Sequence, residues 1–227
     1  MNIYNEDKLK QNYAKIFDQN KEALLNGGHG DPYLNSSKVD TRMGLSLLIR
    51  IKSNVSEKIS NYIHDIQSIE PNLYYYPPSD FHITVLDILR GEPDRTVPEN
   101  LNDYISCIKE CANKVKPFIL EFRNITASDN CVLICGYYEE GLEKLRQLIR
   151  KSLAERNLPL EERYQTFSSH LTVVRIPEQL KEPQKFIEQI KREIYFGQME
   201  VDSLELSFHN WYDSKKTKLA DIVLKKV

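Results

Sequence analysis

The sequence predicts an α+β fold with two lobes, each built from one copy of a strand–helix–strand–strand unit. Two segments, 81–86 and 169–174, share one pattern of apolar residues around a histidine and a threonine. Their histidines stand at positions 82 and 170, an offset of 88 residues. The same offset places the strand predicted at Gly44 on Val132 and the helix predicted near Val55 on Glu143. Because motif and element order recur together, we infer an internal duplication with one copy in each lobe.

Composition and charge limit the class of protein. The chain has 227 residues, of which 41% are apolar and 28% charged, so it can bury a sizeable core. The 31 Lys and Arg residues against 33 Asp and Glu give a net charge of −2, which provides no overall field for holding duplex DNA or a membrane surface. The polar N-terminus and the short apolar runs predict neither a secretory signal nor a transmembrane segment. Four cysteines are too few for a disulfide scaffold, so we expect a cytoplasmic protein. We also expect a monomer.

Residues 1–40 are predicted to form an N-terminal helical arm. An apolar stripe with helical spacing runs through Leu9, Tyr13, Ile16, Phe17 and Leu24. Two glycines after Asn26 end this helix, and 27–32 is typical of a loop. Because no later segment corresponds to it, we expect the arm to be an appendage packed on a main body that spans residues 41–227.

The elements of the main body follow from apolar periodicity. In the first unit we expect a strand from Gly44, a helix over 53–69, strands over 72–76 and 81–89 around a turn at 77–80, and a helix over 98–116. In the second unit we expect strands over 118–125 and 131–138, a helix over 139–155, an extended segment over 163–167 and a strand over 170–176. A helix around Phe186 and two closing strands near 199–208 and 218–224 complete the chain.

The two repeated motifs carry the residues of chemical interest. In a strand, residues i and i+2 point to the same face, so His82 shares a face with Thr84, and His170 shares one with Thr172. The apolar residues beside them point to the opposite face, toward the core. Two pseudo-equivalent strands would therefore direct two imidazoles and two hydroxyls toward a common cleft.

These side chains suit phosphodiester chemistry without a metal. One neutral imidazole can remove a proton from an attacking water or hydroxyl, and the other, as imidazolium, can protonate the leaving oxygen. Threonine hydroxyls can hydrogen-bond the non-bridging phosphate oxygens. A single His-x-Thr in a strand is usually a packed or surface histidine, but two copies in the same context favour a functional pair.

At these motifs the sequence resembles the two-histidine (2H) phosphoesterases, which include LigT-like proteins and RNA cyclic phosphodiesterases. The resemblance rests on the repeated element order and on the tetrapeptides His82-Ile83-Thr84-Val85 and His170-Leu171-Thr172-Val173. It covers residues 42–227. It implies a bilobal, pseudo-two-fold α+β fold in which two antiparallel sheets form a central cleft, with helices outside and one motif from each lobe.

The resemblance also implies an activity and a site. The implied reactions are hydrolysis of a 2′,3′-cyclic phosphate, cleavage of a 2′–5′ or 3′–5′ phosphodiester, and reversible 2′–5′ RNA joining. Substrates would be RNA ends or small nucleotides, with no cofactor, and the implied catalytic residues are His82, Thr84, His170 and Thr172. The motifs leave the natural substrate open, as well as which histidine is acid and which is base. A non-catalytic nucleotide-binding module is the alternative interpretation, and a protein that docks a partner through its N-terminal arm is a third.

Aromatic and basic residues near the motifs are further candidates. Tyr76 and Tyr212 could stack on a base and are predicted to bind substrate. Arg175, three residues after Thr172, would point away from the catalytic face unless a β-bulge intervenes. Arg42 and Arg50 are two further basic candidates, but the sequence alone does not show where they lie relative to the motifs.

No metal site is expected. Structural zinc usually takes cysteine pairs on turns, whereas the pairs here fall in a helix pattern and a strand pattern, at Cys107, Cys111, Cys131 and Cys135. We expect these four cysteines to be buried or half-buried residues with a structural role. The remaining histidines show no partner pattern: His64 lies opposite the apolar stripe of its helix, and His29 and His209 stand alone.

Overall fold

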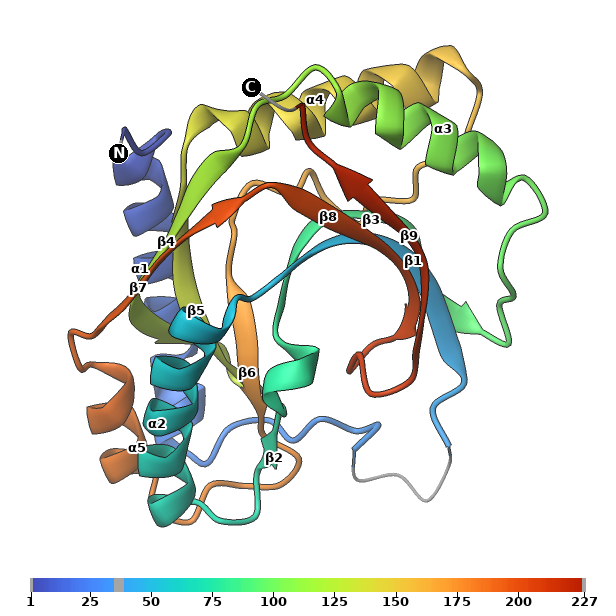
Figure 1. The fold of residues 1–227 in the computed structure, drawn as a ribbon. Coiled ribbons are helices and arrows are strands. Elements are labelled where there is room, and N and C mark those ends of the chain that lie inside the picture. The colour runs from blue at the N-terminus through green and yellow to red at the C-terminus, as the bar shows by residue number, and fades with distance from the viewer. Residues whose placement is uncertain (1, 35–38, 226–227) are drawn as a thin grey trace.

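The computed structural model describes residues 2–34 and 39–225 and has a mixed α+β architecture (Figure 1). The helices are α1 (Glu6–Leu25), α2 (Ser53–Ile69), η1, a 3-10 turn (Pro78–Asp80), α3 (Leu101–Ala112), α4 (Glu140–Glu155) and α5 (Pro183–Ile190). The strands are β1 (Arg42–Arg50), β2 (Tyr74–Tyr75), β3 (His82–Pro93), β4 (Phe118–Ala127), β5 (Cys131–Tyr138), β6 (Leu171–Arg175), β7 (Tyr195–Val201), β8 (Ser203–Asn210) and β9 (Lys216–Val223). No helix among the described residues is long and apolar enough to cross a membrane.

The strands form two antiparallel sheets that repeat one arrangement. One sheet has the order β3-β1-β8-β9 and the other the order β2-β6-β5-β4-β7. The first motif strand, β3, pairs with β1, and the second, β6, pairs with β5. The 88-residue offset of the sequence relates β3 to β6 and β1 to β5 in chain position. The four-stranded sheet is strongly curled and forms an arch (Figure 1).

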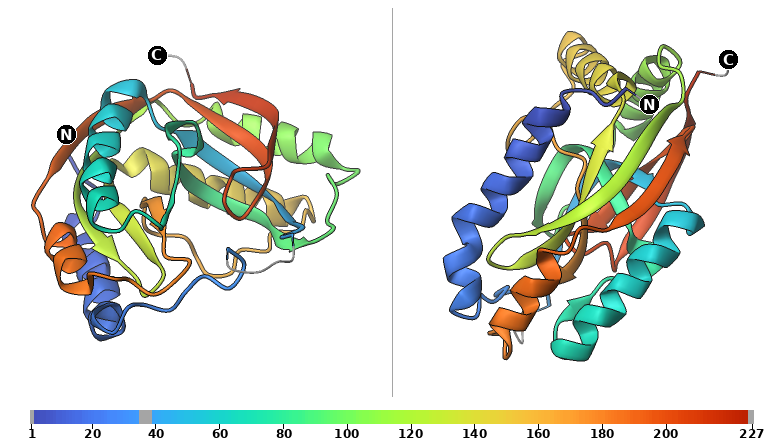
Figure 2. Two further views of the ribbon diagram at one scale, coloured as in Figure 1. Left: turned by 90° about the horizontal axis from the view of Figure 1, so that it is seen from below. Right: turned by 90° about the vertical axis from the view of Figure 1, so that its left-hand side faces the viewer.

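Helices cover the outer faces of the two sheets. Three helices (α1, α2 and α5) group beside the five-stranded sheet, and α3 and α4 lie side by side across the other end of the molecule (Figures 1 and 2). The α1 helix buries Leu9, Tyr13 and Leu24 in the core that it shares with this sheet. Its Tyr13 hydroxyl donates to the carbonyl of Gly136 (2.8 Å) and accepts from the amide of Ser169 (3.2 Å), just before the second motif. The helix is thus tied to the strand that carries the second histidine.

Several element boundaries differ from the expectation. The helix predicted over 98–116 spans only Leu101–Ala112, and the strand predicted over 72–76 is reduced to Tyr74–Tyr75. The segment 163–167, predicted to be extended, has no regular secondary structure. The four cysteines are buried and unpaired. Part of the predicted arm, residues 1 and 35–38, lies outside the described residues.

Candidate active site

The two motif strands come from different sheets and lie beside each other at the centre of the molecule. A buried side chain connects them. The guanidinium of Arg146, on α4, donates to the carbonyls of Val85 (2.9 Å) and Thr84 (3.2 Å) in the first motif. It also donates to the carbonyls of Phe167 (2.9 Å) and Ser168 (2.8 Å), which lead into the second motif. Since Arg146 is 0% exposed, these four hydrogen bonds are not weakened by competition with water.

His82 is anchored through one ring nitrogen. Its Nδ1 donates to the carbonyl of Asp80 at 2.8 Å, so in the neutral imidazole Nε2 is the unprotonated nitrogen. No described residue forms a hydrogen bond with this Nε2, which is therefore available to exchange a proton with a substrate. Burial lowers the pKa of His82 to about 4, and the neighbouring His209 and Arg50 add to the effect, while Asp213 opposes it. His82 is neutral at physiological pH in the ligand-free protein.

His170 is held in the equivalent way. Its Nδ1 lies 2.9 Å from the hydroxyl of Ser168, which stands two residues before it just as Asp80 stands before His82. Burial lowers the pKa of His170 to about 4, and the charges of Arg175 and Arg146 lower it further. The two histidines therefore share a local geometry but differ in the sign of the charges around them.

The motif threonines are half-buried. Thr84 pairs across the ladder with Leu48 of β1, and Thr172 pairs with Leu133 of β5. Within residues 2–34 and 39–225 neither threonine hydroxyl has a hydrogen-bonding partner. A hydroxyl that the protein leaves unused on the cleft side can donate to a phosphate oxygen.

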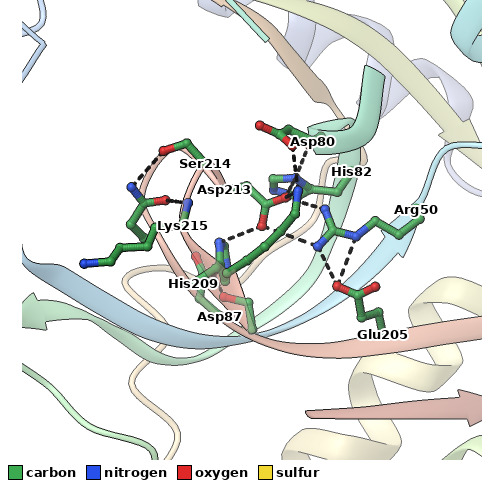
Figure 3. A network of polar contacts seen from close by, with 12 residues as sticks. Arg50, Asp80, His82, Asp87, Glu205, His209, Asp213, Ser214 and Lys215 are labelled. Carbon is green, nitrogen blue, oxygen red and sulfur yellow. Dashed lines mark hydrogen bonds and ion pairs between the residues drawn. The ribbon is translucent and has the colours of Figure 1, made fainter. Parts of the chain in front are cut away.

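A buried carboxylate organises the surroundings of His82 (Figure 3). Asp213, 0% exposed, forms an ion pair with Arg50 and accepts a hydrogen bond from Lys216 at 2.9 Å. Its oxygens also lie 3.8 Å from Nδ1 of His82 and 3.2 Å from Nδ1 of His209. Burial alone would raise the pKa of the Asp213 carboxyl, but these four basic neighbours outweigh it and hold the pKa well below its usual range. Asp213 is thus a fixed negative charge beside the first motif.

A β-bulge follows each motif threonine and changes which later residue shares the face of that threonine. Between Leu47 and Leu48 of β1 the register slips by one residue of β3, and between Val132 and Leu133 of β5 it slips by one residue of β6. An extra residue in one strand reverses the face of every residue after it. Arg175 therefore shares the face of Thr172, and the orientation expected for a regular strand is corrected. At the same place in the first motif, three residues after Thr84, stands Asp87.

The tyrosines predicted to bind substrate are both buried. Tyr76 is 4% exposed, and its hydroxyl accepts a hydrogen bond from Nε of Arg175 at 3.3 Å. Tyr212 is also 4% exposed, and its hydroxyl donates to Asp31 of the N-terminal arm at 2.9 Å. Neither ring has a free face of the size that base stacking needs, so their burial argues against that role. Their neighbour Trp211 is 44% exposed.

The site contains four groups that the sequence patterns did not single out. They are Arg146 between the motifs, Asp213 and His209 beside His82, and Asp87 on the first motif strand. The ring of His209 lies 5.8 Å from that of His82, measured between centroids, so the expectation that His209 stands alone is wrong. The assembled site offers two imidazoles for proton transfer, two threonine hydroxyls, and arginine charge next to His170. That combination fits attack on a phosphate ester.

Comparison with solved structures supports the fold. The chain is similar to TT0787 of Thermus thermophilus, with 18% identity and a TM-score of 0.59 over 80% of this chain and 98% of that one. It is also similar to E. coli LigT complexed with 3′-AMP, with 14% identity and a TM-score of 0.57 over 82% of this chain and 99% of LigT. A structure described only as a phosphoesterase gives 15% identity and a TM-score of 0.57 over 82% and 99% of the two chains. No curated protein sequence matches the chain.

The family is established by a sequence-family model. The model of the 2′-5′ RNA ligase superfamily matches residues 55–210, well over half of the chain and both motifs. These observations agree with the two antiparallel sheets and the paired motifs described above. The chain therefore belongs to the 2′-5′ RNA ligase superfamily, within the 2H phosphoesterases.

Proposed function

We propose that the protein is a metal-independent phosphodiesterase that acts on a 2′,3′-cyclic phosphate or on a 2′–5′ or 3′–5′ phosphodiester of RNA ends or small nucleotides. The observation that carries the proposal is the pair of motifs joined by Arg146. Each histidine is fixed through Nδ1, which leaves Nε2 for the substrate, and each is followed by a threonine whose hydroxyl no described residue engages. Such fixed orientation is what general acid–base catalysis requires.

Hydrolysis of a 2′,3′-cyclic phosphate illustrates the proposed chemistry. One neutral imidazole takes a proton from water as the water oxygen bonds to phosphorus. The bond from phosphorus to one ribose oxygen breaks, and the other histidine, as imidazolium, donates its proton to that oxygen. The product is a phosphate monoester with a free ribose hydroxyl. The hydroxyls of Thr84 and Thr172 and the guanidinium of Arg175 would stabilise the non-bridging oxygens.

The charges around the histidines favour one assignment of acid and base. Asp213 lies 3.8 Å from Nδ1 of His82, whereas the charged neighbours that shift the pKa of His170 are the cations Arg175 and Arg146. Both pKa values lie near 4 and both histidines have cationic neighbours, so the preference rests on the one feature that differs, the carboxylate beside His82, which favours an imidazolium there. We assign His82 as the acid that protonates the leaving oxygen and His170 as the base.

The substrate class is supported by chemistry and by a structural neighbour. LigT, which shares the fold, binds 3′-AMP in its solved complex. A nucleoside monophosphate of this kind is also what hydrolysis of a cyclic nucleotide releases. A nucleotide with its phosphate at the two motifs is thus the substrate class that we propose for this chain.

The test is a substrate panel followed by separation of the products. The purified protein is incubated with 2′,3′-cyclic AMP, with 2′–5′-linked ApA and with 3′–5′-linked ApA, and 2′- and 3′-monophosphates are separated by chromatography. We expect turnover of at least one substrate to a single monophosphate isomer, because a fixed acid protonates only one ribose oxygen. Binding of these nucleotides without turnover would contradict the proposal and support the non-catalytic binding module.

A further inference from the structure

Trp211 lies at the junction of the two motifs. It begins the loop between β8 and β9, and two residues later in the same loop Asp213 contacts His82 of the first motif. On the other side, the guanidinium of Arg175 lies 5.6 Å from the Trp211 ring, and Arg175 shares the face of Thr172 on the second motif strand. The loop therefore places the exposed indole of Trp211 beside Arg175, which belongs to the second motif strand.

A second guanidinium, from the N-terminal side of the chain, lies beside the indole. The guanidinium of Arg42 lies 5.6 Å from the Trp211 ring and stacks on Tyr33, 3.5 Å from that ring's centroid. Two hydrogen bonds of 2.8 Å to the carboxylate of Asp40 fix its orientation. The indole thus has two guanidiniums within the distance at which a cation interacts with an aromatic face.

We infer that Trp211, with Arg42 and Arg175, forms a subsite for the nucleobase of the nucleotide whose phosphate lies at the two histidines. This inference deepens the proposed function and rests on it for the position of the phosphate. Aromatic side chains bind bases through their faces, and neighbouring guanidiniums strengthen the contact and attract the phosphate. Because every base has such a face, the subsite selects for the presence of a base rather than for one base sequence.

The position of Trp211, rather than its exposure, carries the argument. Tyr195 is another exposed aromatic residue, at 53%, with the ammonium group of Lys58 5.8 Å from its ring. It lies on β7, three strands away from the motif strand β6 in the five-stranded sheet. Tyr195 is thus a matched control: an exposed ring with a cation beside it, but outside the cleft.

The binding test uses the fact that Trp211 is the single tryptophan of the chain. Tryptophan emission is followed during titration with 3′-AMP and, separately, with ribose 5-phosphate, which carries a phosphate but no base. We expect a saturable change with 3′-AMP that ribose 5-phosphate does not reproduce, and the same response in the Tyr195→Ala variant. No change with 3′-AMP, or equal changes with both ligands, would overturn the inference. This readout needs no turnover, so it stands even if the protein proves not to be a phosphodiesterase.

The catalytic test compares two cyclic phosphates, 2′,3′-cyclic AMP and the base-free methyl riboside 2′,3′-cyclic phosphate. In Trp211→Ala the ratio of kcat/KM for the nucleotide to that for the base-free compound should fall roughly 5- to 150-fold, the usual effect of removing one stacked aromatic ring. Trp211→Phe should recover part of the loss, and Tyr195→Ala should leave the ratio as in the wild type. A ratio that is unchanged in Trp211→Ala would overturn the subsite. Hydrolysis of neither compound by the wild type would instead refute cyclic-phosphate hydrolysis, and the tryptophan titration would then decide on the subsite.

Discussion

Replacement of Arg146 by Met should loosen the active site, because it removes a side chain that joins both motifs. Methionine fills much of the same space but cannot donate a hydrogen bond. The carbonyls of Thr84 and Val85 then lose their link to those of Phe167 and Ser168. The two histidines would keep their anchors within each motif but lose the fixed relation between motifs.

The size of the effect can be worked from the four hydrogen bonds. A buried polar group left without a partner costs about 1–3 kcal/mol, so four carbonyls at the low end of that range give about 4 kcal/mol. Part of this is offset because the mutation also removes the desolvation of a buried guanidinium, which is the main reason that the pKa of Arg146 is lowered. We expect the free energy of unfolding to fall by about 2–4 kcal/mol, out of a total of roughly 5–15 kcal/mol. A displacement of about 1 Å between the histidines should lower kcat about 10²-fold.

The assay combines urea unfolding with pH profiles of 2′,3′-cyclic AMP hydrolysis. Arg146 also lowers the pKa of His170, so in Arg146→Met that pKa should rise and the profile should move to higher pH. Arg146→Lys keeps the positive charge, but its single ammonium group cannot reach all four carbonyls. It should therefore have the wild-type pH profile but a kcat below that of the wild type. Arg150→Met on the same helix is the control, because Arg150 bonds Glu162 and the carbonyl of Thr166 rather than a motif. A folded Arg146→Met protein with wild-type kcat and an unchanged profile would refute the reasoning.

Four further predictions follow from the site. Asp213→Asn should lower the pKa of His82, because a nearby negative charge is lost, and should reduce kcat about 10- to 100-fold in steady-state assays; an unchanged pH profile would contradict the role of Asp213. Thr84→Val or Thr172→Val should cost about 10²-fold in kcat with little change in KM, and a change in KM alone would instead indicate uniform binding. His82 and His170 are both neutral in the folded protein and protonated in the unfolded chain between pH 4 and about 6.5. Stability should therefore decline as pH falls through this window, by up to about 1.4 kcal/mol per pH unit for each histidine, and calorimetry that shows a flat profile would exclude these pKa values. Turnover should persist in excess chelator, since the proposed chemistry needs only protein groups; loss that zinc or manganese reverses would refute it.

The general layout could be predicted because its signals are local. Alternation with period 2 marks the motif strands, a period of 3.6 marks the helices, and the repeated His-x-Thr motifs align the two halves. Those signals place His82, Thr84 and Thr172 on the strands where the structure has them, while His170, predicted to begin its strand, directly precedes β6. Each element is marked by residues close together in the sequence, and aligning the two halves needs only that two such local patterns match.

The bulges are not predicted by simple alternation, although the sequence contains a sign of them. In each motif the alternation breaks once, at two consecutive apolar residues: Val85-Leu86 in the first and Val173-Val174 in the second. All four are fully buried, as expected when one extra residue is inserted on the core side. Interpreting that break as a bulge would have placed Arg175 on the cleft face.

The buried charged groups were harder to predict. Arg146 falls between Leu142 and Ile149 on the apolar face of its helix, and an arginine at such a position is a signal for a buried hydrogen-bonding role. Asp213 and His209 offer no comparable sign, because they meet His82 only after more than 100 residues of intervening chain. Their proximity depends on the curl of the four-stranded sheet and the return of the β8–β9 loop, which no local pattern specifies.

The central claim is that His82 and His170 act together in proton transfer, and kcat/KM of the His82→Ala, His170→Ala and double variants on 2′,3′-cyclic AMP tests it most directly. Each single variant, checked by circular dichroism for an intact fold, should lose roughly 10²–10⁴-fold, because one proton-transfer partner is missing. The double variant should be little worse than the poorer single variant, since both groups serve one step. A well-folded single variant with near-wild-type kcat/KM would show that its histidine is structural and would contradict the account.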